Sequence, residues 1–254
     1  MLTIDLNSDL GESFGAYTIG ADDMVIPLIT SANVACGFHG GDPVVMRNTV
    51  RLCRENGISV GAHPGYPDLA GFGRRNMALS EDEIYTSLVY QIGALNAFCR
   101  TEGVRLRHVK PHGALYNTAV KSDAAARAIC RAVADAGEGL VLLAPFGSRM
   151  LAYAAEMNVP YACEVFADRG YMPDGSLVPR GQPGAMITDA EEAAKRVIRM
   201  ITEGRVTAAD GTDIAVTADS VCVHGDNRAA QAFVETIRKA LADADIALKP
   251  FDAR

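Results

Sequence analysis

Short apolar runs alternate with longer amphipathic stretches along most of the sequence, and this alternation limits the fold more than any other feature. The apolar runs have the length of strands and lie at residues 2–7, 28–34, 58–62, 106–110, 140–144, 161–166 and 221–224. Patterns with a helical period fall between them, at residues 43–55, 81–102, 123–136, 148–157, 190–203 and 228–242. Strands that alternate with helices are typical of a parallel sheet covered by helices.

Seven such units in 254 residues fit a barrel better than an open sheet, which usually has fewer strands. We therefore predict an α/β fold, a TIM-like (β/α)7 barrel formed by a single domain over residues 1–254. Residues 206–217 interrupt the alternation, because Asp210 and Gly211 lie between β-forming residues. They predict a small hairpin inserted before the last strand. Helix starts are indicated by Asp42 before Pro43 and by Ser80 three residues before Glu83.

Composition argues against several classes of protein. The chain has 24 Lys and Arg against 31 Asp and Glu, a net charge of -7, so it lacks the basic surface that nucleic-acid binding needs. Its apolar stretches are shorter than the roughly 20 residues of a membrane span. The first positive side chain is Arg47, unlike the basic start of a secretory signal. The six cysteines form no CxxC pair, and we expect reduced thiols in a cytoplasmic protein that binds neither nucleic acid nor membranes.

Four of the five histidines directly follow predicted strands, which is the main functional signal in the sequence. His39 follows the second strand, His63 the third, His112 the fourth and His224 the last. The loops after the strands of a parallel barrel converge on one face. We therefore expect these four imidazoles to share a catalytic pocket. His108 lies early in its strand, away from that face, and is expected to be structural.

Acidic and cationic side chains follow the same strands. Asp9 and Glu12 come after the first strand and are candidates for a general base or a metal ligand. Lys110 ends the fourth strand, where it would polarise a carbonyl oxygen or pair with a nearby acid. These three residues complete the predicted catalytic set. The candidates for substrate binding at the remaining strand ends are Asn7, Asn33, Glu164, Asp168, Arg169 and Asp226.

Two further binding sites are suggested by residue type. One carboxylate and two imidazoles on converging strand ends can hold a divalent ion, and Asp9, His63 and His112 form such a trio. Linear spacing does not test this trio, because its members follow different strands. In GFGRR at 71–75, Arg74 and Arg75 could bind an anion together with backbone amides, although a solvated loop is the more common outcome.

Two kinds of catalytic motif are missing from the sequence. No lysine stands in a GxxxxGK[ST] pattern, so the chain has no P-loop for ATP. There is no GxSxG pattern, and no cysteine is adjacent to a histidine. An acyl-enzyme route is therefore disfavoured.

Six ordered blocks between residues 5 and 226 resemble the LamB/YcsF family. They are DLNSDLGESFG at 5–15, NVACGFHGGD at 33–42, HPGYPD at 63–68 followed by GFGRR at 71–75, VKPHGALYN at 109–117, the segment 164–171 and CVHGD at 222–226. Ser8 stands where the family often has cysteine, which argues that this position is not a nucleophile.

The resemblance implies a seven-stranded barrel related to the glycoside hydrolase/deacetylase barrels. It also implies the A subunit of a bacterial ATP-dependent 5-oxoprolinase, which acts with B and C subunits to open 5-oxo-L-proline to L-glutamate. The partner subunits would then bind ATP and activate the ring, or share in binding it, and the barrel would complete hydrolysis. On this hypothesis Asp9 or a histidine activates water, while Lys110, Arg169 or a metal ion stabilises the negative oxygen.

Two other functions stay open at this point. One is a metal-dependent deacylase of the polysaccharide-deacetylase type, which needs no ATP and uses Asp9, His63 and His112 as ligands. The other is a non-catalytic binding or scaffold subunit. The sequence also leaves open whether the chain forms a homo-oligomer and which residue accepts the proton.

Overall fold

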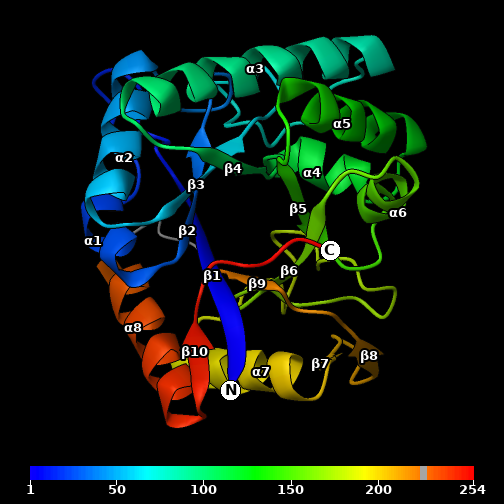
Figure 1. The fold of residues 1–254 in the computed structure, drawn as a ribbon. Helices are drawn as coiled ribbons and strands as arrows, with labels where there is room; N and C mark the ends of the chain where they lie inside the picture. The colour runs from blue at the N-terminus through cyan, green and yellow to red at the C-terminus, as the bar shows by residue number, and fades with distance from the viewer. Residues whose placement is uncertain (224–227) are drawn as a thin grey trace.

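Seven parallel strands close into a barrel within residues 1–223 and 228–254, the parts of the chain that the computed structural model describes (Figure 1). Around the barrel they are β1 (Leu2–Leu10), β2 (Ser31–Ala35), β3 (Ser59–His63), β4 (Leu106–Val109), β5 (Val141–Pro145), β6 (Tyr161–Phe166) and β9 (Ser220–Cys222). Strand β9 pairs with both β6 and β1, which closes the sheet. The predicted seven-stranded parallel barrel is confirmed.

The helices lie outside the barrel wall (Figure 1). They are α1 (Asp22–Val25), α2 (Pro43–Glu55), α3 (Glu81–Thr101), α4 (Gly113–Ala119), α5 (Asp123–Ala136), α6 (Arg149–Glu156), α7 (Ala190–Thr202) and α8 (Arg228–Asp243). Their inward stripes pack on the outer face of the strands, where Leu88, Ile92 and Ile129 are fully buried. Each buried aliphatic side chain of this size contributes about 1.5–3 kcal/mol to folding, so this layer stabilises the barrel.

Two helix starts have the caps that the sequence indicates. The Asp42 carboxylate accepts hydrogen bonds from the amides of Val44 and Val45 at the start of α2. Ser80 and Glu83 form a capping box at the start of α3. Asp42 also accepts a hydrogen bond from the Gly15 amide at 2.8 Å. One carboxylate therefore starts α2 and holds the loop that follows β1.

Three short elements differ from the prediction. Residues 28–30 do not belong to β2, because the chain forms a 3-10 helix, η1 (Ile26–Leu28), and the strand begins only at Ser31. Helix α4 starts directly after His112 and is not among the helical stretches that the sequence predicts. Strand β10 (Ile246–Leu248) pairs in parallel with the start of β1. A short apolar run does not by itself distinguish a strand from a helical turn.

The predicted hairpin is present. Strands β7 (Arg205–Thr207) and β8 (Asp213–Ala215) pair antiparallel, with Val206 opposite Ile214. Gly211 in the connection has φ +89°, a conformation that glycine adopts without steric cost. The hairpin precedes β9 and reaches toward the open end of the barrel, where it lines the cavity described below.

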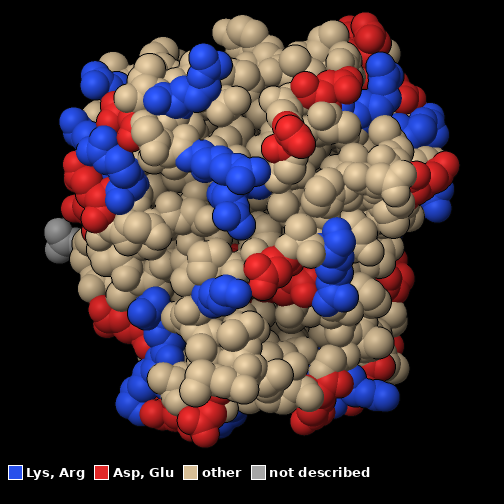
Figure 2. Space-filling model, in the orientation of Figure 1, with Lys and Arg blue, Asp and Glu red and all other residues tan. Residues whose placement is uncertain are grey.

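Charged groups of both signs are interspersed on the face of the molecule that Figure 2 presents, with uncharged residues between them. Among the described helices, none has both the length and the apolar content that crossing a membrane requires. The six cysteines are buried, and none of them forms a disulfide in the described structure.

Candidate functional site

A cavity of about 900 Å³ opens at the end of the barrel where the parallel strands finish. Part of its wall is the loop after β6, residues 173–180, and part is the hairpin, through Ile214 and Ala215. Its remaining wall and floor include side chains at the ends of β1 and β3 and just after β1 and β4. Those that the sequence predicts as catalytic are Asp9, Glu12, His63, Lys110 and His112.

Lys110 lies at the floor of the cavity between two carboxylates. Its Nζ is 2.9 Å from Asp9 Oδ1 and 2.7 Å from Glu164 Oε1. Burial alone would lower the pKa of Lys110, but the charges of Asp9 and Glu164 outweigh it and raise that pKa well above its ordinary value. Lys110 is therefore an ammonium ion paired with nearby acids, the second of the two roles considered for it. We call Asp9, Lys110 and Glu164 the upper layer of the barrel interior.

The two acids of the upper layer have further partners. Asn33 Nδ2 donates to Asp9 Oδ1 at 2.8 Å, and Asp9 Oδ2 lies 3.3 Å from His63 Nε2. The Tyr116 hydroxyl donates to Glu164 Oε2 at 2.6 Å. Burial, reinforced by the charge of Glu164, raises the pKa of Tyr116, so its phenol stays protonated. Tyr116 lines the cavity but is not among the residues that the sequence predicts for the site. It lies one helical turn after His112 on α4, so the position of that helix is the signal that indicates it.

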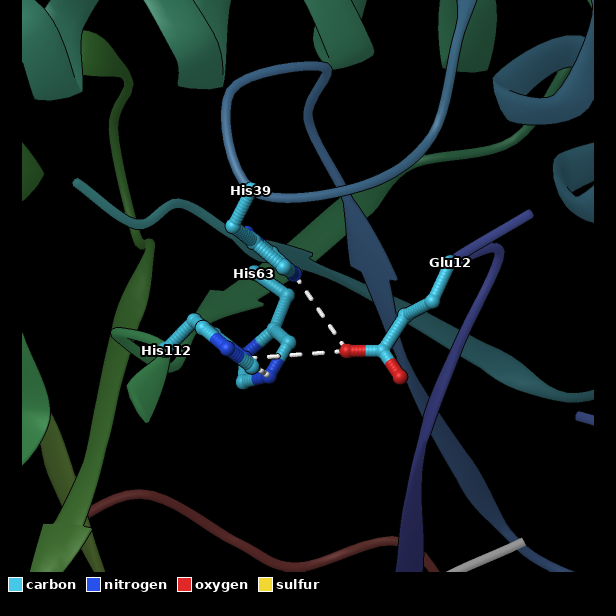
Figure 3. Close-up of side chains that lie close together, drawn as sticks. All are labelled: Glu12, His39, His63 and His112. Atoms are coloured by element: carbon cyan, nitrogen blue, oxygen red, sulfur yellow. Dashed lines mark hydrogen bonds and ion pairs between the residues drawn. The ribbon is translucent and has the colours of Figure 1, made fainter. Parts of the chain in front are cut away.

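Three histidines and a glutamate meet beside Asp9 (Figure 3). Glu12 follows β1, His39 lies between β2 and α2, His63 ends β3 and His112 precedes α4. One ligand atom from each of the four lies within 4.8 Å of the others. The structure thus brings together three of the four predicted histidines. It also changes the composition of the predicted metal trio, because Glu12 and His39 join His63 and His112 in this cluster while Asp9 stands next to it.

Backbone carbonyls orient two of these rings. His63 Nδ1 lies 2.7 Å from the Lys110 carbonyl oxygen, and His112 Nε2 lies 2.8 Å from that of Phe72. The remaining nitrogens, His63 Nε2 and His112 Nδ1, are 3.1 Å apart. His39 Nε2 is 3.3 Å from Glu12 Oε1. Burial, followed by the neighbouring histidines, lowers the pKa values of His39 and His112 well below the ordinary value.

Glycines let the loop after β3 close over the histidines. His39 stacks on His112 with ring centroids 3.6 Å apart. A Cβ atom at Gly73 would lie 2.7 Å from His39 Cβ and 2.8 Å from His112 Cδ2, and Gly73 also has φ +62°. A Cβ at Gly65 would lie 2.9 Å from His39 Nδ1. A larger residue at Gly73 would therefore displace the stacked rings.

Asn7 and Asn33 are fully buried beneath the cavity and do not line it, unlike the substrate contacts predicted for them. Asn33 Nδ2 donates to Asn7 Oδ1 at 2.7 Å as well as to Asp9. We therefore correct their role from contacting substrate to positioning Asp9. His108 Nε2 lies 2.7 Å from Asn33 Oδ1, and burial lowers the pKa of His108 to about 3. His108 is part of this buried network, in keeping with the structural role expected for it.

At the other end of the barrel interior, Asp5 is fully buried among hydroxyl groups. Its carboxylate accepts hydrogen bonds from Thr30 and Ser31, each at 2.6 Å, and from Ser220. Burial raises the pKa of Asp5 to about 6, although these hydrogen bonds oppose the shift. We call Asp5, Thr30, Ser31 and Ser220 the lower layer.

Three residues in and directly after β6 also depart from the predicted substrate contacts. Glu164 is buried and paired with Lys110, and Asp168 is buried and does not line the cavity. Arg169 does line it, but its guanidinium donates to the carbonyls of Val178 at 2.8 Å and Ala185 at 3.0 Å. Arg169 therefore holds the loop that forms the cavity wall. The other two predicted residues, His224 and Asp226, lie outside the described residues.

The two arginines of the predicted anion site have separate environments. Arg74 lines the cavity, and its guanidinium carbon lies 5.0 Å from the centroid of the Phe72 ring. Arg75 does not line the cavity, because its Nε pairs with Asp68 Oδ1 at 3.0 Å. This pairing lowers the pKa of Asp68 to about 2. The predicted pair is therefore corrected to Arg74 alone on the cavity side.

Comparison with known proteins finds relatives over nearly the whole length. The family model described as the LamB/YcsF family matches residues 4–254. A protein of Pyrococcus abyssi, named as the A subunit of 5-oxoprolinase, is 53% identical over 249 residues, which cover 98% of each chain. One of the same name from Symbiobacterium thermophilum is 55% identical over 245 residues, or 96% of this chain and 94% of the relative. The crystal structure of a lactam utilization protein from Thermus thermophilus matches with a TM-score of 0.94 and 47% identity, and covers 98% of this chain and 100% of the other.

Proposed function

Because this chain belongs to the LamB/YcsF family, we propose that it is the A subunit of a 5-oxoprolinase, which opens the cyclic amide of 5-oxo-L-proline to L-glutamate. The observation that carries the proposal is the cavity floor, where Asp9 and Lys110 meet beside His63, in a chain so similar to relatives of that name. We propose further that the reaction consumes ATP and requires B and C subunits.

The chemistry of the substrate explains why ATP would be needed. A lactam resists attack by water because its nitrogen donates electron density into the carbonyl group. Phosphorylation of the carbonyl oxygen by ATP removes this resistance and releases ADP. Water can then add to the ring carbon, the carbon–nitrogen bond breaks to give a glutamyl phosphate, and a second water releases inorganic phosphate and glutamate. The chain has no P-loop, which supports ATP binding by or together with the partner subunits and completion of hydrolysis in this barrel.

Asp9 is the group best placed to accept a proton from the attacking water. It lies on the cavity wall, and its Oδ1 is held by Lys110 and Asn33 while Oδ2 lies toward His63. The ammonium of Lys110 stabilises the ionised form of Asp9. The same positive charge favours the negative oxygen that develops when water adds to the ring.

Arg74 suits a substrate that carries a carboxylate, and the cavity is large enough to hold more than that substrate. The carboxylate of 5-oxoproline can pair with a guanidinium on the cavity wall, and Arg74 is there beside Phe72. The cavity volume of about 900 Å³ is far larger than this small ring requires. The remaining space would admit a phosphoryl group or a segment of another polypeptide of the complex.

The test is reconstitution of purified chain with the B and C subunits, with release of glutamate and of ADP both followed. Asp9→Asn should lower glutamate release at least about 100-fold, because it removes the base. Asp174→Asn is the matched control, since Asp174 also lines the cavity but is exposed and pairs with Lys121, and it should leave turnover nearly unchanged.

Full turnover by Asp9→Asn would remove Asp9 from the mechanism. Hydrolysis of an acetylated sugar without ATP would instead support the metal-dependent deacylase. Normal assembly with the partner subunits but no binding of 5-oxoproline, in both the wild type and cavity variants, would support a scaffold role.

A further inference from the structure

We propose that His63, His112 and Glu12 hold a divalent transition-metal ion on the cavity wall, and that Zn²⁺ suits this donor set. The ligand atoms are His63 Nε2, His112 Nδ1 and Glu12 Oε1 (Figure 3). This site goes beyond the proposed function, because binding of the ion does not depend on which reaction the protein performs.

The first step concerns where the two imidazoles carry their protons. A carbonyl oxygen only accepts hydrogen bonds, so His63 must be protonated on Nδ1, which faces the Lys110 carbonyl, and His112 on Nε2, which faces that of Phe72. Each neutral ring then has a bare lone pair on its other nitrogen. Those two nitrogens face each other at 3.1 Å. Two acceptors cannot form a hydrogen bond, and a cation is the group that suits the space between them.

Carboxylate oxygens approach the same point. Glu12 Oε1 lies 3.6 Å from His112 Nδ1, and Asp9 Oδ2 lies 3.3 Å from His63 Nε2. Four side chains thus direct lone pairs at one small region, and two of them are acids. The convergence comes from separate segments of the chain, which makes it a property of the folded barrel rather than of one local turn.

The distances and ring angles suit one ion. Ligands about 2.0–2.1 Å from a tetrahedral Zn²⁺ are about 3.3 Å from one another, and the observed separations of 3.1 and 3.6 Å lie on either side of that value. The planes of His63 and His112 are 88° apart, so both lone pairs can point at the same position. The carbonyl partners of their other nitrogens are the outer-shell contacts that metal-binding histidines usually have.

His39 is a positioning residue in this arrangement and not a ligand. An ion lies near the plane of the imidazole that binds it, and the rings of His39 and His112 are stacked with only 2° between their planes. Two rings stacked in this way cannot both point at one ion. His39 Nε2 lies 3.3 Å from Glu12 Oε1, where it can donate a hydrogen bond and orient that carboxylate. Asp9 also stays outside the ligand set, because it is not among the four residues whose ligand atoms all lie within 4.8 Å of one another.

The donors favour a transition metal over Mg²⁺ or Ca²⁺, which prefer oxygen ligands. Three protein ligands leave a position for water, as in catalytic rather than structural zinc sites. Glu12, His63 and His112 line the cavity, so the ion and this water would be reachable from it.

The experiment is calorimetric titration of Zn²⁺ into the full chain after removal of metals by a chelator. We expect one ion per chain, and Co²⁺ in its place should give the visible absorption of a four-coordinate ion. His63→Ala and His112→Ala should lose more affinity than the roughly 10–100-fold that loss of an outer-shell partner costs, and His39→Asn should fall within that smaller range.

Two further variants make the result decisive. His108→Gln is the matched control, because His108 is buried in the same barrel but outside the cluster, and its affinity for Zn²⁺ should equal that of the wild type. Glu12→Gln tests a ligand with a side chain 11% exposed, which keeps the test valid if a histidine variant does not fold. As a ligand variant, it should weaken binding more than His39→Asn does.

Absence of a bound Zn²⁺ in the wild type would overturn the proposal, as would unchanged affinity in His63→Ala, His112→Ala and Glu12→Gln. A loss in His39→Asn equal to that in His63→Ala would overturn the ligand assignment. The titration contains no substrate, ATP or B and C subunits. If the chain binds Zn²⁺ but does not support glutamate release, the proposed function is contradicted and this inference stands.

Discussion

The lower layer around Asp5 and the upper layer around Asp9 are built from the same strand, with the two acids four residues apart on its inward face. Asp5 is fully buried and hydrogen-bonds to three hydroxyl groups. Asp9 is 17% exposed on the cavity wall and pairs with the ammonium of Lys110. Two aspartates on one strand therefore meet neutral donors at the closed end and a charged donor at the open end.

This difference separates an acid held inside the fold from one that a ligand in the cavity can reach. Neutral hydroxyl groups do not fully offset the cost of burying a charge, so the pKa of Asp5 rises to about 6. At the open end, the ion pair keeps charges of both signs in place within reach of a ligand. Both layers contain an aspartate on β1. The hydrogen-bonding partners of each aspartate and its access to the cavity determine whether it can contact a ligand.

Removal of the Lys110 ammonium should lower stability and turnover more than the changes described below. It would also remove the charged donor that distinguishes the upper layer from the lower layer. Lys110→Met leaves Asp9 and Glu164 without their shared cation, which should lower the free energy of unfolding by about 3–5 kcal/mol. Glutamate release should fall at least about 100-fold. Urea unfolding and the reconstituted assay measure the two losses. Unchanged stability would show that the ion pairs are not needed to hold the upper layer together.

Asp5 in the lower layer should make the free energy of unfolding depend on pH. The folded protein binds a proton at Asp5 more tightly than the unfolded chain does, because the native pKa is about 6 against an ordinary 3.8. The stability that this group contributes is therefore present at low pH and is lost as the pH rises through 6. Between about pH 4 and 7 the wild type should lose about 2 kcal/mol relative to Asp5→Asn, measured by urea unfolding. A parallel course for the two proteins would mean that Asp5 does not titrate in this range.

Loss of one neutral donor that contacts the upper layer should have a smaller effect. Tyr116→Phe removes the hydrogen bond to Glu164 and should cost about 1.5 kcal/mol of stability, with turnover reduced about tenfold. Tyr171→Phe is the matched control, because the Tyr171 hydroxyl accepts from the Phe166 amide at 2.9 Å. It should lower stability by a similar amount and leave turnover unchanged. Equal loss of turnover in both variants would mean that Tyr116 acts only through stability.

An ion pair outside both layers should matter least. Lys121 and Asp174 are 3.0 Å apart at the mouth of the cavity, and both side chains are more than half exposed. Lys121→Met should change the free energy of unfolding by less than about 1 kcal/mol in thermal or urea unfolding. It also serves as the lysine control for Lys110→Met. A loss as large as that of the buried lysine would contradict the view that burial gives the upper layer its importance.

The repeating pattern was sufficient to predict the barrel and the face on which three of the histidines gather. Parallel strands end on one side, so residues after successive strands meet there, and His39, His63 and His112 do. The short elements were not predictable. Strand β10 has three residues and depends on pairing with β1, and η1 occupies an apolar run that resembles a strand.

Depth along a strand was the information that the sequence lacked at the site. Asn7 and Asp9 have the same parity on β1, so sequence pattern places both inside the barrel, but only Asp9 reaches the cavity. The sequence also does not show which of Arg74 and Arg75 lines the cavity. Arg75 is turned to Asp68, seven residues earlier in the same loop, and only the folded loop brings these two together. Such distinctions depend on loop geometry, which periodicity does not encode.

Strand β1 pairs with one strand that is synthesised early, β2, and one that is synthesised late, β9. The barrel therefore cannot close until most of the chain has been made. The partner β2 is synthesised shortly after β1, but the other edge of β1 pairs with β9, where Asp5 lies opposite Ser220. At common rates of translation the intervening chain takes roughly 10 to 40 seconds to produce. During that interval the nascent protein carries an unpaired β edge, which invites association with other chains. The barrel therefore closes only after residues 220–222 have been synthesised. A chain truncated before β9 would keep an unpaired strand edge that can associate with other chains.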